Sequence, residues 1–308
     1  MSDFEAGSAP HDPVRFIESD FRAAVPGEPN DDPEDGPVQL HHYTSGQGLF
    51  GILNSGEVHC TNILYMNDSS EMDYGRALAS SLLDDAAERV AEPIKRLLPA
   101  IRRSLEMPDF QYFVSCFCEK PDLLSQWRAY GAQSAGYCIG FAAEDLRKVL
   151  PEYAELVRVM YDPGEQEKML RHAFRHYVAT AERCCANYPD HPRLEEALSR
   201  WAAATSNFLG RLLARMKSPA FEEEREWRVI IIRFTFDQGK VRFRVAPSGI
   251  FIPYFPFFFK KDGVKAVREV RHGPTVNPTL AVRSAGGLLN HLGYTDVRLS
   301  GSAIPLRA

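Results

Sequence analysis

The stretch Val38-Gln39-Leu40-His41-His42-Tyr43-Thr44-Ser45 is where ordered structure is expected to begin in this chain. Residues 38–43 of this stretch read as a first strand, and in an extended chain His42 and Thr44 share one face while Tyr43 lies on the other. An imidazole with a hydroxyl two residues further on can donate to and accept from a ribose or a phosphate. Taken alone, however, His42 fits a structural strand histidine better than a ligand-binding one.

The 37 residues before this strand differ from the rest in composition. They contain six prolines and the acidic run Asp31-Asp32-Pro33-Glu34-Asp35, and only Val14 to Val25 has helical character. Such a composition predicts a mobile N-terminal arm over 1–37. Residues 38–308 are expected to form a single α+β domain.

Overall composition restricts the class of protein. The chain has 308 residues, of which 44% are hydrophobic and 25% charged, with a net charge of −5 and six cysteines. This charge argues against a broad nucleic-acid surface. No stretch approaches the roughly 20 apolar residues of a membrane span, and the acidic N-terminus lacks a signal pattern. Six cysteines in a chain of this length make no disulfide framework, so we expect a cytoplasmic protein without membrane partners.

Hydrophobic periodicity predicts the order of helices and strands. Helices are expected at 46–55, 73–105 with a restart at Pro93, 164–216 as a hairpin, and in a segment ending near Gly293. Short strands are expected at 38–43, 58–61, 112–118, 136–141, 157–161, 227–236, 240–245, 267–272 and 296–299, with a hairpin turn at Gly239. Short strands segregated from long helices indicate an α+β fold with a helical insertion at about 164–216.

A second cluster of polar residues enters a late strand. Glu222 and Glu223 fit a solvated charge run. Glu224 and Glu226 are spaced by two at the strand entrance, so both can point into one cleft. Like charges that close raise the pKa of one carboxyl, which suits a hydrogen-bonding or acid–base role. The alternative is that neighbouring arginines neutralise the cluster.

Three further segments carry candidate ligand-binding residues. Asn67, Asp68 and Glu71 can approach a ligand from a loop, although helix capping explains Asp68 as well. Ser115 lies near the end of a predicted strand. Trp127 and Tyr130, three apart on a helix, present one aromatic face on which a planar base can stack, and core packing is the equal alternative.

Metal and nucleophile patterns are weak. His172 and His176 are four apart on a helix, but no glutamate follows His172 as a zincin requires. Cys60, Cys116, Cys118 and Cys138 lack zinc-knuckle spacing, and nothing in the sequence near Cys116 lowers its pKa. No glycine-rich phosphate loop is present. We expect no metal.

The chain from Leu40 onward resembles a widespread bacterial domain-of-unknown-function family. The motifs that carry the resemblance run through the chain in order. They are His42 to Ser45, Asn67 to Glu71, Ser115 to Phe117, Trp127 to Tyr130, Phe221 to Arg228 and Ser302 to Pro305.

The order of elements is also distantly similar to the ADP-ribosyltransferase superfamily. This resemblance implies a split, largely antiparallel sheet that binds NAD⁺ as substrate. His42, Tyr43 and Thr44 would then hold the nicotinamide ribose, with Asn67 and Glu71 nearby. Ser115, Trp127 and Tyr130 would frame the nicotinamide, and Glu226 or Glu224 would be catalytic with His42. Glu224-Arg225-Glu226 is similar to the biglutamate form of these enzymes and His42 to the histidine form, so the subclass stays open.

The first hypothesis is therefore an ADP-ribosyltransferase-like enzyme that cleaves NAD⁺ and transfers ADP-ribose to an unknown acceptor. In this hypothesis Glu226 binds the ribose 2′-hydroxyl and stabilises the cationic sugar carbon. The second is a non-catalytic nucleotide-sensing module in phage defence or toxin–antitoxin biology. A metal-dependent nuclease using Asp68, Glu71 and Glu226 ranks below both.

Overall fold

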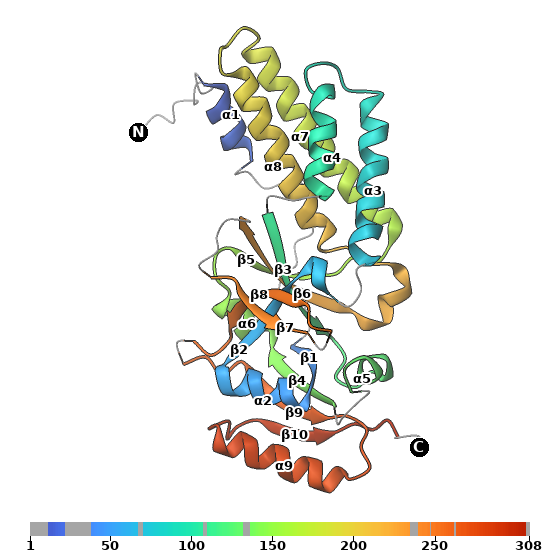
Figure 1. Ribbon diagram of the computed structural model, residues 1–308, viewed down its shortest axis with the longest axis vertical. Helices are drawn as coiled ribbons and strands as arrows, with labels where there is room; N and C mark the ends of the chain where they lie inside the picture. Colours follow the sequence, from blue (N-terminus) through green and yellow to red (C-terminus); the bar gives the residue numbers. More distant parts are fainter. Residues whose placement is uncertain are drawn as a thin grey trace, which may run out of the picture. The chain divides into compact units, whose positions relative to one another are not determined.

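The computed structural model describes residues 12–21, 38–66, 70–106, 110–131, 136–234, 240–246, 248–261 and 263–305, except for the side chains at 70–72, 110, 131 and 234. The chain divides into two compact units (Figure 1). The helical unit comprises Met1–Pro29, Ser70–Phe110 and Asp162–Met216. The sheet unit comprises Asn30–Ser69, Gln111–Tyr161 and Lys217–Ala308.

The helical unit is built from helices that are far apart in the sequence. They are α1 (Pro13–Asp20), α3 (Ser70–Ala87), α4 (Leu98–Glu106), α7 (Pro163–Asn187) and α8 (Leu194–Leu213), with the 3₁₀ turn η3 (Lys95–Leu97) before α4. Asp162 caps α7 by accepting a hydrogen bond from the Glu165 amide, and Pro163 fits its first turn. Trp201 of α8 is fully buried and donates its indole N–H to the Tyr177 carbonyl of α7, 2.7 Å away. The predicted hairpin at 164–216 is thus present as α7 and α8.

The sheet unit contains a mostly antiparallel sheet. Its strands are β1 (Gln39–Ser45), β2 (Glu57–Asn62), β3 (Phe110–Cys118), β4 (Gly136–Ala142), β5 (Ala154–Arg158), β6 (Glu226–Phe234), β7 (Arg242–Val245), β8 (Phe251–Phe258), β9 (Val267–His272) and β10 (Arg298–Gly301). The strand order is β10-β9-β4-β1-β3-β2-β8-β7, and β6 pairs with both β3 and β5. Only β9 and β10 run parallel among the pairings whose register the described residues define. An α+β fold with a largely antiparallel sheet is therefore confirmed.

Regular strand pairing is interrupted between two central strands of this sheet, β1 and β3. β1 pairs with β4 along its whole length, from Gln39 to Ser45. On its other edge, within the described residues, the register with β3 consists of one pair, His41 with Cys118. The rest of β1 runs beside β3 without ladder pairing, which leaves backbone and side-chain polar groups there to find other partners.

The main core lies against one face of the strands. Four helices of the sheet unit flank the strands: α2 (Gly46–Ser55), α5 (Leu124–Gly131), α6 (Ala143–Val149) and α9 (Pro278–His291). Leu53 of α2, Leu146 of α6 and Leu289 of α9 share one buried cluster with strand residues such as Phe117 and Val270. The α5 helix instead places Trp127 in a smaller cluster. Gly56 ends α2 at φ +69°, a left-handed conformation that favours glycine.

Several expectations about elements were wrong. Strand β7 pairs with β8 rather than with β6, so the predicted hairpin at Gly239 does not join those two strands. Strand β8 was not among the predicted strands; prolines are rare inside a sheet, yet Pro253 and Pro256 of β8 pair with Phe243 and His59. The second helix of the 73–105 segment begins at Leu98 and not at Pro93.

Two other expectations are tested only in part. Within the predicted arm at 1–37, residues 13–20 form α1, which packs on α7 and α8; most of the rest lies outside the described residues. No helix in the described part of the chain combines the length and apolar character needed to cross a bilayer.

Candidate functional site

Strand β6 begins with a buried ion pair. Glu226 and Arg228 point to one face of the strand, while Trp227 and Val229 join the core on the other. Arg228 Nε donates to Glu226 Oε1 at 2.8 Å and Arg228 Nη2 to Oε2 at 3.3 Å. Glu226 is 2% exposed and Arg228 is fully buried. Two charges so deeply buried require close pairing because desolvation penalises each of them.

A 3₁₀ turn brings a second cation and a second carboxylate to this pair. Lys217 precedes the turn η4 (Pro219–Glu224), and its ammonium donates to Glu224 Oε2 at 2.8 Å and to Glu226 Oε2 at 3.0 Å. Arg225 ends the turn at φ +43°, a left-handed conformation that few residues other than glycine adopt. The strained turn lets Glu224 and Glu226 share one lysine.

The charge cluster fixes the protonation state of Glu226. Burial alone would raise its pKa, but the charges of Arg228 and Lys217, with hydrogen bonds from Arg228 and the Cys116 thiol, lower the pKa to about 2. The sequence predicted instead that one carboxyl of the pair would have a raised pKa; for Glu226 this is corrected, because Arg228 and Lys217 outweigh the effect of burial. An always-ionised carboxylate is a poor proton donor or acceptor near neutral pH, so its available role is electrostatic.

Cys116 of β3 lies between Glu226 and His42. Its thiol donates to the Glu226 carboxylate, and burial with the charge of Glu226 raises the pKa of this thiol well above its usual value. Its backbone carbonyl accepts a hydrogen bond from His42 Nδ1 at 2.9 Å. Burial lowers the pKa of His42. The neutral imidazole therefore keeps its proton on Nδ1, and Nε2 is an acceptor with no hydrogen-bond partner among the described residues.

His42 and Glu226 thus contact Cys116 from different sides. The ring of His42 lies 5.6 Å from that of Phe117, whereas Glu226 contacts the side chain of Cys116. Successive side chains of a strand point to opposite faces, so Phe117 and Cys116 point away from each other. The structure connects the two predicted catalytic residues through Cys116 and gives them no direct contact.

The opening between β1 and β3 holds two more predicted residues. Thr44 belongs to β1 and Ser115 to β3, the two strands that this opening separates. Both side chains are buried, and the Ser115 hydroxyl has no hydrogen-bond partner in the described part of the chain. A buried hydroxyl without a partner is costly, which makes this a place where a ligand or water can bind.

Tyr130 is the aromatic residue of α5 that reaches both the charge cluster and solvent. It is 41% exposed. Desolvation and the nearby Cys116 and Glu226 raise the pKa of its phenol. Tyr161 lies on another side of the cluster, where its hydroxyl accepts a hydrogen bond from the Glu226 amide at 2.9 Å. Tyr130 therefore stays neutral near pH 7 and can stack on or donate to a ligand.

Trp127 and Tyr43 pack against each other. Their rings meet edge to face, with centroids 4.7 Å apart, in a cluster with Cys118 and Cys138. Trp127 is 4% exposed, and the Tyr43 hydroxyl donates to the Lys120 carbonyl and accepts from the Leu123 amide. The two residues belong to the packing of α5 on β1, so the aromatic face predicted for Trp127 with Tyr130 reduces to Tyr130 alone.

Asp122 explains the motif near the C-terminus. Its Oδ1 accepts from Trp127 Nε1 and from the Ser302 hydroxyl, each at 2.6 Å, and its Oδ2 accepts from the Ala303 amide at 2.8 Å. These hydrogen bonds outweigh burial and lower the pKa of Asp122. The segment around Ser302 thereby fastens the end of the chain to α5, and this role needs no ligand.

Some predicted residues cannot be placed. Asn67 and Asp68 lie outside the described residues, and the side chain of Glu71, at the start of α3, does too. Within the residues that are described, no group of three His, Cys, Asp or Glu side chains could hold a metal ion. Lys217, Cys116 and Tyr161 were not predicted as site residues. No local sequence pattern marks them, because their positions depend on contacts between distant segments.

Comparison with known proteins adds a family match over part of this region. The family described as "Protein of unknown function (DUF2971)" matches residues 126–229, from α5 into β6. This range contains Tyr130, Lys217, Glu224, Glu226 and Arg228. The predicted resemblance to a domain-of-unknown-function family is confirmed over this range. No curated protein and no solved structure matches the chain.

Proposed function

We propose that the sheet unit binds a nucleotide beside β3, where the ladder opens toward β1. The proposal rests on the single His41–Cys118 pair between β1 and β3. Beyond this pair, in the described part of the chain, polar groups of the two strands are not used in pairing between them. The His42 Nε2 atom can accept, and the Ser115 hydroxyl can donate and accept. These are the groups that ribose hydroxyls require. The half-exposed ring of Tyr130 supplies a stacking surface for a base.

NAD⁺ cleavage with transfer of ADP-ribose is the reaction this site would support. Cleavage of the bond between the ribose and nicotinamide leaves positive charge on the sugar carbon, which a fixed anion stabilises. Glu226 is such an anion because its pKa is held at about 2. Glu226 contacts the Cys116 thiol and His42 the Cys116 carbonyl, so a ligand would have to enter between β1 and β3 to approach both residues. The acceptor of ADP-ribose stays undefined.

A second candidate is nucleotide binding without turnover. Arg228 and Lys217 favour this candidate, because they lie 2.8 and 3.0 Å from the Glu226 carboxylate. Their positive charges weaken the negative potential by which the carboxylate would stabilise a cationic sugar. Glu226 would then hold Arg228 and Lys217 in place, and the site would sense a nucleotide instead of cleaving it.

Calorimetry and product analysis separate the two candidates. NAD⁺, ADP-ribose and ATP are titrated into the purified chain, and nicotinamide release is followed by chromatography with and without cell lysate. Tyr130→Ala is expected to weaken nucleotide binding about tenfold through lost stacking. Tyr153→Ala is the matched control, since this tyrosine is similarly exposed but lies against Arg233.

Each result of these two measurements supports or excludes one of the candidate functions. Release of nicotinamide that Tyr130→Ala slows supports the transferase. Binding without release supports the sensing module. If none of the three nucleotides binds, both candidates are overturned.

A further inference from the structure

The segment that contains β7 and β8 has a charge opposite to that of the whole chain. Between residues 240 and 261 there are five basic residues, Lys240, Arg242, Arg244, Lys260 and Lys261, and no aspartate or glutamate, whereas the chain has a net charge of −5. Strand β7 stands at one end of the strand order, and all four of its residues are exposed. A local excess of exposed positive charge attracts anions to this part of the sheet unit.

The two arginines of β7 reach toward β2 on the face of the sheet away from the main core. Alternate residues of β2 belong to that core, so Glu57 and Thr61 point away from it. Arg242 Nη1 donates to the two carboxylate oxygens of Glu57 at 3.3 and 3.2 Å, and Arg244 Nη2 donates to the Thr61 hydroxyl at 3.0 Å. Each guanidinium is therefore held in position by a side chain of β2.

An imidazole lies beside these two guanidinium groups. The ring of His59 stacks on that of Tyr254, with centroids 3.8 Å apart, and its Nε2 lies 3.4 Å from Glu57 Oε1. Burial lowers the pKa of His59, and the charges of Arg244 and Arg242 lower this pKa further, while Glu57 raises it. Because both arginines act on one imidazole, the two cations lie near the same point on the surface.

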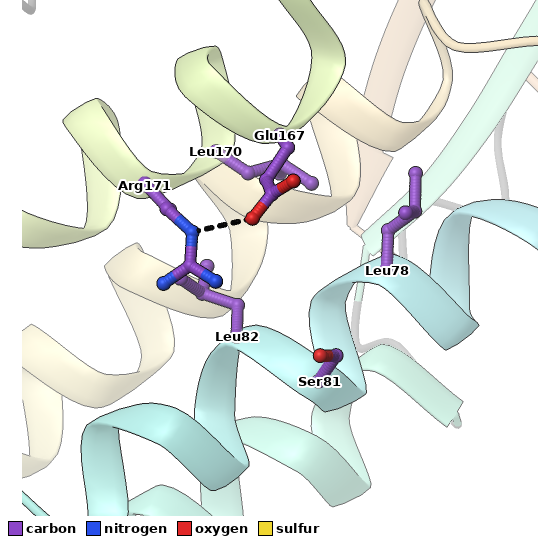
Figure 2. A pocket seen from close by; sticks show the side chains of 6 residues that line it. All are labelled: Leu78, Ser81, Leu82, Glu167, Leu170 and Arg171. Carbon is purple, nitrogen blue, oxygen red and sulfur yellow. Dashed lines mark hydrogen bonds and ion pairs between the residues drawn. The ribbon is translucent and has the colours of Figure 1, made fainter. Parts of the chain in front are cut away.

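Arg244 differs from an arginine that carboxylates already neutralise. Figure 2 shows a hollow of about 120 Å³ between α3 and α7, where Arg171 donates to Glu167 at 2.8 Å and to Asp85 at 2.7 Å. Arg244 instead donates to an uncharged hydroxyl, and none of the ion pairs among the described residues includes it. A guanidinium has five N–H donors, so Arg244 keeps both its charge and most of its donors for a ligand.

We propose that Arg242 and Arg244 bind a phosphate group on this face of the sheet unit, with His59 at its side. The planar fork of a guanidinium matches two phosphate oxygens, and two such groups match a phosphate ester or pyrophosphate. Because Glu57 and Thr61 hold the arginines in place, less side-chain freedom is lost on binding. This inference does not rest on the proposed nucleotide site, whose polar groups lie on β1 and β3.

The test titrates pyrophosphate into the full chain by calorimetry at low ionic strength, because salt screens exposed charges. Arg244→Ala should weaken pyrophosphate binding about tenfold through the loss of a charge-assisted contact. Arg244→Lys keeps the charge but loses the fork, so it should weaken binding about threefold. Arg283→Ala is the matched control, because this exposed arginine of α9 carries the same charge elsewhere on the sheet unit, and it should leave binding unchanged.

ADP-ribose and adenosine, titrated in parallel, identify the source of the phosphate. If Arg244→Ala weakens ADP-ribose but not adenosine, the phosphate is that of the nucleotide; if it weakens pyrophosphate alone, the site takes a separate phosphate ester, and both results support the proposal. Pyrophosphate binding without any nucleotide binding supports this site and overturns the nucleotide site. Pyrophosphate that does not bind, or that Arg244→Ala and Arg283→Ala weaken equally, overturns the phosphate site whatever the nucleotides do.

Discussion

Two strands of the sheet unit, β6 and β9, share a local sequence pattern, a glutamate two residues before an arginine. Glu226 and Arg228 lie on β6, and Glu269 and Arg271 on β9. Each glutamate is 2% exposed, and each accepts a hydrogen bond from the arginine of its own strand. The sequence singled out Glu226 and passed over Glu269.

The partners of the two glutamates differ. Glu269 also accepts from Arg298 and from the Ser300 hydroxyl, both on β10, and so fastens β10 to β9. Glu226 is bound by Lys217 from a turn and by the thiol of Cys116, and Tyr130 lies close by. One carboxylate joins two strands, whereas the other lies among groups that can meet a ligand. A local motif therefore does not distinguish a structural from a functional carboxylate; its neighbours do.

The largest expected effect is on Glu226. Glu226→Gln removes a counter-charge that Arg228 and Lys217 share while both cations stay buried, so the free energy of unfolding should fall by about 3–5 kcal/mol. Urea denaturation measures this loss. A loss below about 1 kcal/mol would mean that the cluster is solvated, and the contrast with Glu269 would disappear.

The pH dependence of stability should report the same carboxylate. The folded-state pKa of Glu226, about 2, lies below its ordinary value near 4.5. Its contribution is therefore present above about pH 4.5 and is lost as the pH falls toward 2, about 3 kcal/mol in all. The stability difference between wild type and Glu226→Gln, measured by denaturation from pH 6 downward, should shrink over this range. A difference that does not change with pH would contradict the lowered pKa.

Glu269→Gln should cost less, about 2 kcal/mol, because Arg298 is 67% exposed and water can solvate it once the carboxylate is gone. Its effect should also be local. Hydrogen exchange should accelerate in β10, with little change in β6. Equal acceleration in both strands would show that the two carboxylates support one network, and the comparison would fail.

The smallest effect concerns the chain end. Ser302→Ala removes one of three hydrogen bonds to Asp122, so the free energy of unfolding should fall by about 1 kcal/mol. Thermal denaturation measures this change. Ala303→Ser is a suitable control because Ala303 contributes its backbone amide to Asp122. A larger loss in the control than in Ser302→Ala would show that the side chain of Ser302 is not the group that matters.

Much of the fold followed from local patterns. Helix α2 has the predicted bounds, 46–55, and β1, β3, β4 and β9 lie where apolar runs indicated. Gly56 has a local physical reason to adopt positive φ, and a buried strand needs a run of apolar residues. Strand β8 was missed because the fit of Pro253 and Pro256 depends on which backbone positions the neighbouring strands require.

The site was less predictable for the same reason. Glu226 could be found because it enters a strand beside another glutamate. Its ionisation could not, since it depends on Lys217, nine residues earlier, and on Cys116, on another strand. Trp127 was a candidate for stacking on a ligand, with core packing as the equal alternative, and Asp122 and Tyr43 fix it in the packing of α5. Contacts between distant segments decided each of these outcomes.

The single pair between β1 and β3 has a consequence for motion within the sheet. Strands joined by a full ladder exchange their amide hydrogens together, whereas strands joined at one position can open separately. Amides of Tyr43 to Ser45 that face away from β4 should therefore lose protection earlier than those bonded to β4. The sheet would then behave as two cooperative folding units that meet at His41 and Cys118, with His42 and Cys116 at their boundary.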